Sequence, residues 1–202
     1  MARRNNERKP NPPLDPRALH RAVNEAKTIA DSENVEVALA GGVAMQLYGS
    51  PRLTGDVDII SDKEPFGVPE GGRLTIGGIS TEVSGVPVDF IVRDDIYRGL
   101  YEEALHNARR PPTSDVKMLV VAPEYLVAMK IAARRGKDAD DVDWLLESGM
   151  LDMPKTRKIV LRHLGAYGLE ELNDRIVEGQ LFDERNKRTA ALRRKLMNDD
   201  PE

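Results

Sequence analysis

The chain has 202 residues, a formal net charge of −4 and no cysteine. This length fits one domain of ordinary size, or one domain with a small appendage. Without cysteine, disulfides and thiolate metal sites are excluded, and the three histidines are too scattered for a zinc cluster. The mild acidity indicates no general affinity for nucleic acid or membrane, and no run of about 18 apolar residues predicts a membrane span. We expect a cytoplasmic protein with no membrane partner.

The N-terminal segment, residues 1–13, is basic and rich in Asn and Pro, which predicts a disordered tail. Asp15 followed by Pro16 predicts a helix start, because aspartate caps helix N-termini and proline fits the first helical position. Apolar residues at helical spacing from Ala18 to Ala30 predict that this helix is amphipathic.

A short strand is expected over residues 36–40, running directly into Gly41 and Gly42 and then into a helix that ends near Gly49. Bare backbone N–H groups at a helix start can receive phosphate oxygens, since that helix end is positive and glycine allows close approach. Gly41 and Gly42 are therefore candidate nucleotide-binding residues. A tight turn that needs glycine for conformational reasons is the structural alternative.

Two acidic residues, Asp56 and Asp58, head the next expected strand, and Asp89 lies on a later one. Side chains alternate along a strand, so Asp56 and Asp58 are expected on one side while Val57 and Ile59 point into the core. If the two strands are neighbours, Asp89 joins the pair. Three carboxylates repel one another unless a cation lies between them, and oxygen ligands suit Mg²⁺ or Mn²⁺. This pattern predicts a metal site, although an isolated acid pair is often a solvated loop edge.

The remaining chain predicts an α+β protein in which the strands come first and the helices later. A surface loop is expected from Asp62 to Gly72, and Ser84-Gly85 is expected to be the turn of a hairpin. The predicted hairpin strands are 74–83 and 86–92, and the last strand is 116–122. Helices are predicted after Asp94-Asp95 to about residue 106, then over 123–134, 139–146, 154–164, 169–177 and 183–197. The expected organisation is a tail (1–13), a core (14–122) and a helical C-terminal region (123–202).

Three segments together resemble the minimal nucleotidyltransferases of the DNA polymerase β superfamily. They are Leu39-Ala-Gly-Gly-Val-Ala-Met, Pro51-Arg-Leu-Thr-Gly-Asp-Val-Asp-Ile-Ile and Val88-Asp89-Phe90. A later segment, from Tyr125 through Lys130 and Asp141 to Leu146, resembles the helical half of the AbiEii-type branch, which includes toxins of type IV toxin–antitoxin pairs. The resemblance covers roughly residues 35–146 and implies a small mixed sheet flanked by helices, with a helical part following it.

Site residues follow from this resemblance position by position. It implies that Gly41 and Gly42 form the nucleotide-triphosphate motif and that Asp56, Asp58 and Asp89 are metal ligands. The lysine that reaches a phosphate matches Lys130, and an acid of the last motif matches Asp141. The family usually has Ser after the first Gly, where this chain has Gly42. From the sequence alone, Arg52 is a further candidate clamp on the phosphates, because it lies between the glycine pair and the acids.

The alternative for Lys130 is a solvated lysine whose stem covers apolar surface. Asp138 and Asp140, which open a predicted helix, are more typical of capping residues than of catalytic ones.

The expected reaction is metal-dependent transfer of an NMP from an NTP such as ATP to a hydroxyl acceptor, with two Mg²⁺ (or Mn²⁺) as cofactors. The acceptor stays open: a tRNA 3′ end, a small molecule such as an antibiotic, or a protein side chain. A basic C-terminal helix could follow a phosphate backbone, or could be a solvated face. Its basic residues are Arg185, Lys187, Arg188, Arg193, Arg194 and Lys195. Rival interpretations are a catalytically inactive nucleotidyltransferase fold that binds a regulatory partner such as an antitoxin, and a plain interaction domain.

Overall fold

The structure is a computed structural model that describes residues 12–112, 116–134 and 136–198. The chain divides into two compact units, Met1–Leu126 and Val127–Glu202. The predicted tail at residues 1–13 falls almost entirely outside the described residues.

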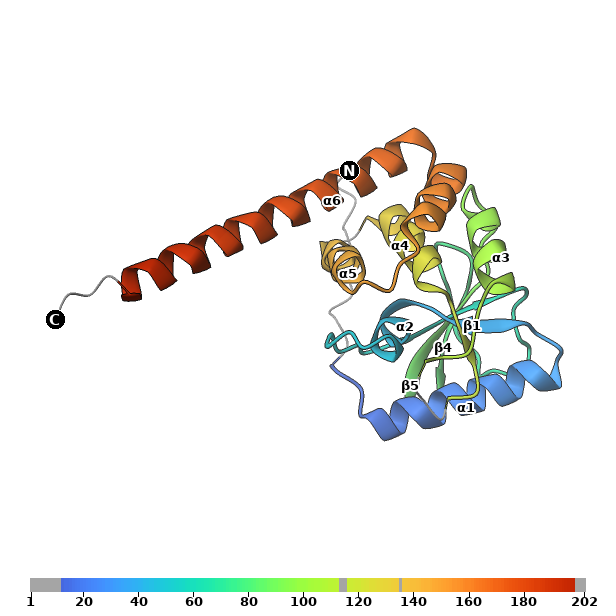
Figure 1. Ribbon diagram of the computed structural model, residues 1–202. Coiled ribbons are helices and arrows are strands. Elements are labelled where there is room, and N and C mark those ends of the chain that lie inside the picture. Colours follow the sequence, from blue (N-terminus) through green and yellow to red (C-terminus); the bar gives the residue numbers. More distant parts are fainter. Residues whose placement is uncertain (1–11, 113–115, 135, 199–202) are drawn as a thin grey trace, which may run out of the picture. The chain divides into compact units, whose positions relative to one another are not determined.

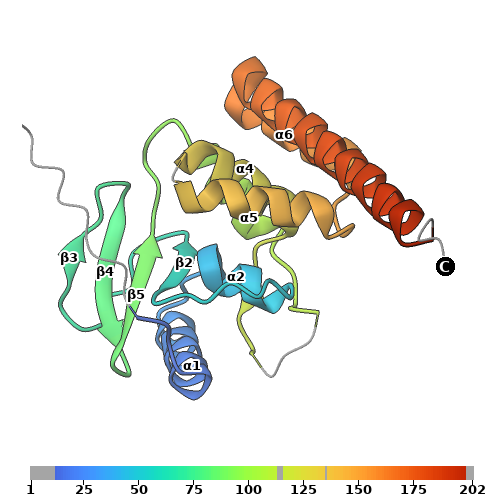
Figure 2. The same ribbon diagram turned by 90° about the vertical axis from the view of Figure 1, so that its left-hand side faces the viewer.

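The first unit is built on a six-stranded mixed sheet with the order β3-β4-β5-β2-β1-β6. Figure 2 shows β3, β4, β5 and β2 side by side in this order. The strands are β1 (Val37–Leu39), β2 (Val57–Ser61), β3 (Gly72–Arg73), β4 (Gly78–Val83), β5 (Val86–Ile91) and β6 (Leu119–Val120). Three of the six described helices, α4 to α6, follow the last strand, and the sheet mixes parallel and antiparallel pairs, so the predicted α+β fold class is confirmed.

The centre of the sheet is apolar because β1, β2 and β5 are rich in β-branched and aromatic residues that favour buried strands. Leu39, Ile59, Val88 and Phe90 are fully buried. β2 and β5 pair in parallel, and β1 and β2 pair antiparallel. A buried parallel pair at the centre therefore fixes the position of any polar residue placed on it.

Helix α1 (Pro16–Ser32) begins as expected, since the Asp15 carboxylate accepts a hydrogen bond from the Ala18 backbone N–H at 3.0 Å. It packs against β4 and β5 through a stripe of small side chains, and covers one face of the sheet (Figure 1, Figure 2). The stripe consists of Ala22, Val23, Ala26 and Ala30, all buried.

Helix α2 (Gly41–Leu47) follows β1 directly and has only seven residues. Its C-terminus is anchored by Tyr48, whose hydroxyl donates to the Val121 carbonyl at 3.1 Å. Burial raises the pKa of the Tyr48 hydroxyl, although the Arg109 guanidinium beside it lowers that pKa. The phenol therefore stays a neutral donor at physiological pH.

The β4–β5 hairpin turns at Ser84-Gly85 as predicted, with positive φ angles of 51° and 75° at the two residues. That combination defines the type I′ turn that fits the strand twist. The prediction that β4 starts at Leu74 was wrong. The strand starts at Gly78, because residues 74–77 form a tight turn before it, in which the Gly77 backbone N–H donates to the Leu74 carbonyl at 3.2 Å.

Helix α3 (Arg98–His106) starts later than its predicted cap at Asp94-Asp95. The Asp95 carboxylate accepts hydrogen bonds from the Arg93 side chain and from the Tyr97 backbone N–H, so it stabilises a preceding turn. The expected strand over 116–122 was also too long. Only Leu119 and Val120 pair, in parallel, with β1.

The remaining helices are α4 (Pro123–Ala133), α5 (Gly136–Glu147) and α6 (Met153–Asn198). Gly165, with φ 70° and ψ −163°, kinks α6 where a break between predicted helices was expected. The second predicted break, between residues 177 and 183, is absent from α6. The one glycine there, Gly179, costs only about 1 kcal/mol relative to alanine in a helix, which does not end it.

Within the described residues, no helix is both long and apolar enough to cross a membrane.

Candidate active site

The parallel register of β2 and β5 sets Asp58 directly opposite Asp89. Neighbouring residues in register on paired strands project from the same face, so the two half-buried aspartates are adjacent on the sheet, roughly 4.8 Å apart at the backbone. We refer to Asp58 and Asp89 as the carboxylate pair. The condition for Asp89 to join the acids, that its strand lies beside the strand of Asp58, is therefore met.

Ser80 extends this row by one strand, because β4 pairs antiparallel with β5 and sets Ser80 opposite Asp89. Residues directly opposite in an antiparallel pair share a face, so the half-buried hydroxyl neighbours the carboxylate pair. Sequence reasoning missed Ser80, since a serine in the middle of a strand carries no motif of its own.

The glycine pair reaches this row because β1 ends beside β2. The Ala40 backbone N–H donates to the Asp58 carbonyl at 2.8 Å, and the chain then turns into α2 at Gly41. A Cβ added to Gly41 would overlap the Asp58 carboxylate oxygen Oδ2, and Gly41 has a φ of +56°. Only glycine fits there, so the Gly41 backbone and the Asp58 carboxylate form one continuous surface.

Gly42 meets a different set of side chains. A Cβ there would lie 2.5 Å from Thr54 Oγ1 and 2.9 Å from Arg52 Nη1. The predicted clamp Arg52 therefore lies against the glycine turn, as its position in the sequence suggested. Because α2 has two turns at most, its dipole contributes little, and the glycines matter through the space they leave open.

Asp56 lies just before β2 and is half-buried. The Thr54 hydroxyl donates to its carboxylate oxygen Oδ1 at 2.8 Å, with the Asp56 carbonyl at 3.2 Å as a second acceptor. Thr54 was not among the predicted site residues. Only the three-dimensional course of residues 50–56 reveals its contact with Gly42.

The chemistry of the carboxylate pair suits a hard cation. Carboxylate oxygens are preferred ligands of Mg²⁺ and Mn²⁺, and Mg²⁺ is commonly held by one or two carboxylates with substrate phosphates completing its shell. Across residues 12–112, 116–134 and 136–198, no group of three or more His, Asp or Glu side chains stands in an arrangement that could hold a metal by itself. The ligand role of Asp56, Asp58 and Asp89 stays a prediction.

Lys130 and Asp141, both in the second unit, form a separate buried cluster with Asp138. The Lys130 ammonium lies 2.5 Å from Asp141 Oδ2 and 3.1 Å from Asp138 Oδ1, and all three side chains are at most 8% exposed. The alternative of a solvated Lys130 is therefore wrong. A cavity of about 370 Å³ borders Lys130 and Asp138, so a cationic group lies at its wall. Whether Lys130 and Asp141 contact a nucleotide stays a prediction.

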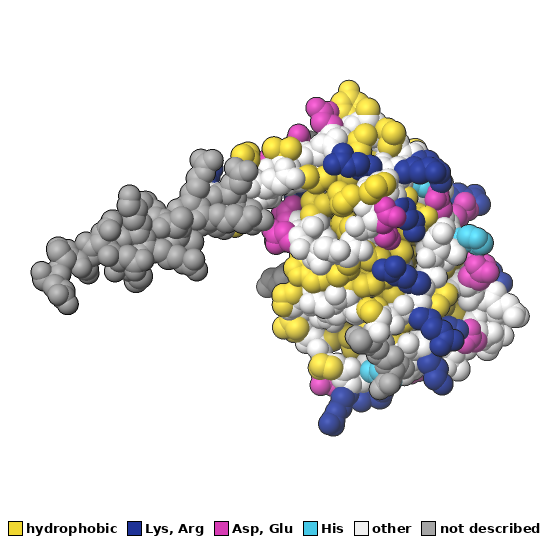
Figure 3. Space-filling model, viewed as in Figure 1, with side chains coloured by type: hydrophobic (Ala, Val, Ile, Leu, Met, Phe, Trp, Pro, Cys, Tyr) yellow, Lys and Arg dark blue, Asp and Glu magenta, His cyan; other side chains and the backbone are white. Residues whose placement is uncertain are grey.

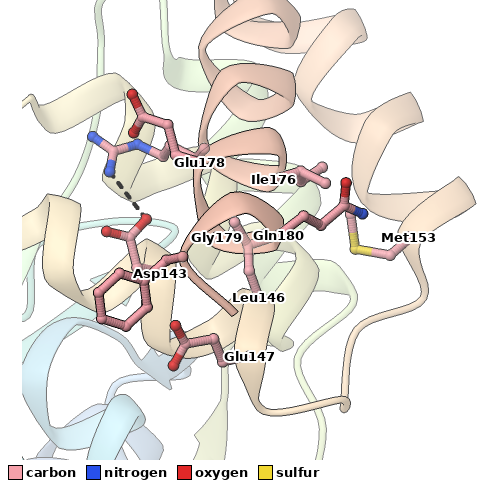
Figure 4. A pocket seen from close by; sticks show the side chains of 10 residues that line it. Asp143, Leu146, Glu147, Met153, Ile176, Glu178, Gly179 and Gln180 are labelled. Atoms are coloured by element: carbon pink, nitrogen blue, oxygen red, sulfur yellow. Dashed lines mark hydrogen bonds and ion pairs between the residues drawn. The ribbon is translucent and has the colours of Figure 1, made fainter. Parts of the chain in front are cut away.

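A second cavity of the same unit lies between α5 and α6, with a volume of about 620 Å³ (Figure 4). Asp143 and Arg175 form an ion pair at its wall, at 3.1 Å, and Leu146, Met153 and Ile176 give it an apolar lining. All eight predicted site residues are described, and none of them lines this cavity.

The basic residues predicted to follow an RNA backbone are mostly outside the described side chains. Arg185 is exposed, and the side chains of the other five are not described. On the face seen in Figure 3, basic and acidic side chains are interspersed among hydrophobic ones.

No protein-family model matches the chain. No curated protein matches it either. Among solved structures, the chain is similar to an antigenic nucleotidyltransferase-like protein from Paracoccidioides brasiliensis. The TM-score is 0.52 at 20% identity, over 90% of this chain and 95% of that one. This chain has a nucleotidyltransferase-like fold.

Two further structures are those of the antibiotic-resistance factor ANT(2″)-Ia. One, in solution, has a TM-score of 0.41 at 16% identity, over 90% of this chain and 98% of that one. The other, in complex with adenylyl-2″-tobramycin, has a TM-score of 0.40 at 17% identity, over 83% of this chain and 98% of that one.

Proposed function

We propose that the chain is a nucleotidyltransferase that moves an NMP from an NTP to a hydroxyl group of an acceptor, with Mg²⁺ or Mn²⁺ as cofactor. The observation that carries this proposal is the carboxylate pair, in register on two buried parallel strands, with the Gly41 backbone against Asp58. The fold, which resembles that of a nucleotidyltransferase-like protein, supports the same reaction class.

In this proposal, Asp56, Asp58 and Asp89 supply ligands to the metal, phosphate oxygens of the NTP complete its shell, and the glycine turn receives the triphosphate. A bound Mg²⁺ would neutralise phosphate charge and lower the pKa of the attacking hydroxyl. Gly41 and Gly42 leave room for phosphate oxygens to approach the backbone, and the Arg52 guanidinium beside Gly42 binds one of those oxygens. Lys130 and Asp141, in the second unit, are further proposed nucleotide-binding residues, as the resemblance implies.

The chemical step is an in-line displacement at the α-phosphorus. The acceptor oxygen forms a bond to that phosphorus, the bond to the oxygen that bridges the α- and β-phosphates breaks, and pyrophosphate leaves. The proton of the acceptor hydroxyl passes to the Asp89 carboxylate, one strand away from Asp58, and then to water. Fixed charges that favour the developing negative charge account for most of the expected rate.

The finer assignment is to the AbiEii-type branch, with a tRNA 3′ end as the first acceptor and a cognate antitoxin as a regulatory partner. It is supported by the segment that resembles that branch, from Tyr125 to Leu146. A small hydroxylated molecule such as an antibiotic is the second acceptor class.

A transfer assay with α-labelled NTP tests the proposal. The protein is incubated with Mg²⁺ and each of the four NTPs, with total tRNA, pooled aminoglycosides or protein as acceptor. We expect label to move to one acceptor class with release of pyrophosphate. Asp58→Ala should abolish transfer, whereas Asp94→Ala, which removes an exposed acid after the C-terminal end of β5, should retain it. Transfer by Asp58→Ala at the wild-type rate would disprove the proposed mechanism.

A further inference from the structure

Thr54 occupies the junction between the glycine turn and the acidic residues. The residue is 6% exposed, and its hydroxyl donates to Asp56 Oδ1 at 2.8 Å. Carboxylate and carbonyl oxygens only accept, so the hydroxyl proton is committed to Asp56. A threonine has few rotamers, and this bond therefore fixes the orientation of one carboxylate oxygen.

The backbone around Thr54 is also held in place. Its carbonyl accepts a hydrogen bond from the Leu14 backbone N–H at 3.0 Å, and the Gln46 side-chain amide donates to the Arg52 carbonyl at 2.9 Å. The segment that carries Thr54 is therefore tied both to the N-terminal chain and to α2. A hydrogen bond from such a fixed segment can hold a carboxylate in one orientation.

The same side chain explains why this chain has glycine at position 42. A Cβ on Gly42 would lie 2.5 Å from Thr54 Oγ1 and 2.7 Å from Thr54 Cβ, so the β-branched side chain already fills that space. A serine at position 42 would displace Thr54, and with it the bond to Asp56.

We propose that Thr54 is a positioning residue that orients the Asp56 carboxylate for metal binding, and that Gly42 is required because Thr54 occupies the adjacent space. This inference rests on the proposed function. Partners that orient metal-binding side chains typically contribute about 10- to 100-fold to metal affinity or activity. The hydroxyl, rather than the bulk of the side chain, is the group that matters.

The test compares Thr54→Val, which keeps the shape and removes the hydroxyl, with Thr54→Ser, which keeps the hydroxyl. A matched control is Thr81→Val, because Thr81 is also buried and its hydroxyl donates to the Pro69 carbonyl, away from Asp56. Mn²⁺ binding to each protein is measured from the electron paramagnetic resonance signal of free Mn²⁺, with a non-hydrolysable NTP analogue present and the analogue without protein as the reference. The kcat and KM for NTP are measured in the transfer assay, and urea unfolding checks that each variant is folded.

Thr54→Val is expected to lose about 10- to 100-fold in Mn²⁺ affinity and in kcat with little change in KM, whereas Thr54→Ser and Thr81→Val stay close to wild type. Mn²⁺ affinity of Thr54→Val equal to that of wild type would overturn the inference and leave the proposed function standing. An equal loss in Thr54→Ser would overturn it as well. A wild-type protein that neither binds Mn²⁺ nor transfers label would overturn the proposed function and the inference together.

Discussion

Gly41 combines a φ of +56° with a position where any side chain would overlap the Asp58 carboxylate. These are two separate reasons for glycine, and they can be separated by experiment. The left-handed conformation costs a residue with a side chain roughly 1–2 kcal/mol. The overlap adds a second cost, because either the Asp58 side chain or the chain at Gly41 must move.

We therefore predict that Gly41→Ala destabilises the protein by more than about 2 kcal/mol and abolishes transfer. The matched control is Gly85→Ala, in the same unit, where φ is +75° and no atom lies within 4 Å of the added Cβ. Gly85→Ala should lower the free energy of unfolding, measured in urea, by about 1–2 kcal/mol and should retain transfer. If both variants lost the same free energy of unfolding, the overlap with Asp58 would add nothing to the cost of a side chain at position 41.

At the residue scale, the placement of Asp58 and Asp89 could be predicted from the sequence. Each is followed by an apolar run rich in β-branched residues, which indicates a buried strand. When two such strands pair, only a few alignments keep their apolar side chains buried. The role of Thr54 could not be predicted, because a threonine hydroxyl near a turn has many local acceptors. The contact between Arg52 and Gly42 was suggested only by their order in the chain.

At the scale of the elements, the cluster of Lys130, Asp138 and Asp141 links α4 to α5. Removing one member of a buried ion pair leaves uncompensated charge and typically costs about 3–5 kcal/mol. Neutralising all members together avoids most of that cost. The sequence indicated a lysine on a helix. Its burial could not be predicted, because it depends on α5 bringing Asp138 and Asp141 beside Lys130, which helical periodicity does not show.

We predict that Lys130→Met lowers the free energy of unfolding by about 3–5 kcal/mol, and that adding Asp138→Asn and Asp141→Asn to it restores most of the loss. The control is Lys27→Met, which breaks an ion pair with Asp31 on α1 whose side chains are 25% and 61% exposed. Its cost should stay below about 1 kcal/mol. If Lys130→Met lowered the free energy of unfolding in urea as little as Lys27→Met does, this account of the cluster would be refuted.

The turn before α3 gives a pH-dependent prediction. Partial burial raises the pKa of the Asp95 carboxyl, but hydrogen bonds from Arg93 and from the Tyr97 backbone outweigh it and hold that pKa below the ordinary 3.8. The folded protein therefore binds this proton less readily than the unfolded chain does. The stabilisation is complete well above pH 3.8 and declines as the pH falls through the lowered folded pKa.

Accordingly, wild type should be more stable than Asp95→Asn at pH 7, by about 1 kcal/mol or less because Asp95 is 41% exposed. This difference should shrink as the pH falls below about 4, where the unfolded carboxyl becomes protonated. This stability difference is measured by thermal unfolding of both proteins, from pH 7 down to the lowest pH at which both still fold. A difference that grows on acidification would contradict the sign of the pKa shift.

The ends of helices and strands could be predicted only where they depend on local contacts. The cap at Asp15 is local, so α1 was predicted correctly at its start. Asp95 has the same local chemistry, yet Arg93 competes for its carboxylate and α3 begins later. The extent of β6 depends on how far β1 reaches, which is a tertiary property.

At the scale of the whole molecule, the resemblance implied a small mixed sheet with a helical part after it, and α4, α5 and α6 do follow the last strand of a mixed sheet. The order was predictable because strand and helix periods alternate clearly along the chain. The continuity of α6 through residues 177–183 could not be predicted, because strong helix formers (Glu178, Gln180, Leu181) alternate there with weak ones such as Gly179. The acceptor depends on shape and charge across a whole surface, which short motifs do not encode.

The most direct test of the central claim is a crystal structure with Mn²⁺ and a non-hydrolysable NTP analogue, in which anomalous scattering locates the metal. We predict an anomalous peak about 2.1 Å from carboxylate oxygens of both Asp58 and Asp89, with the triphosphate against Gly41 and Gly42. Metal and nucleotide bound elsewhere, with the carboxylate pair contacting neither, would contradict the account.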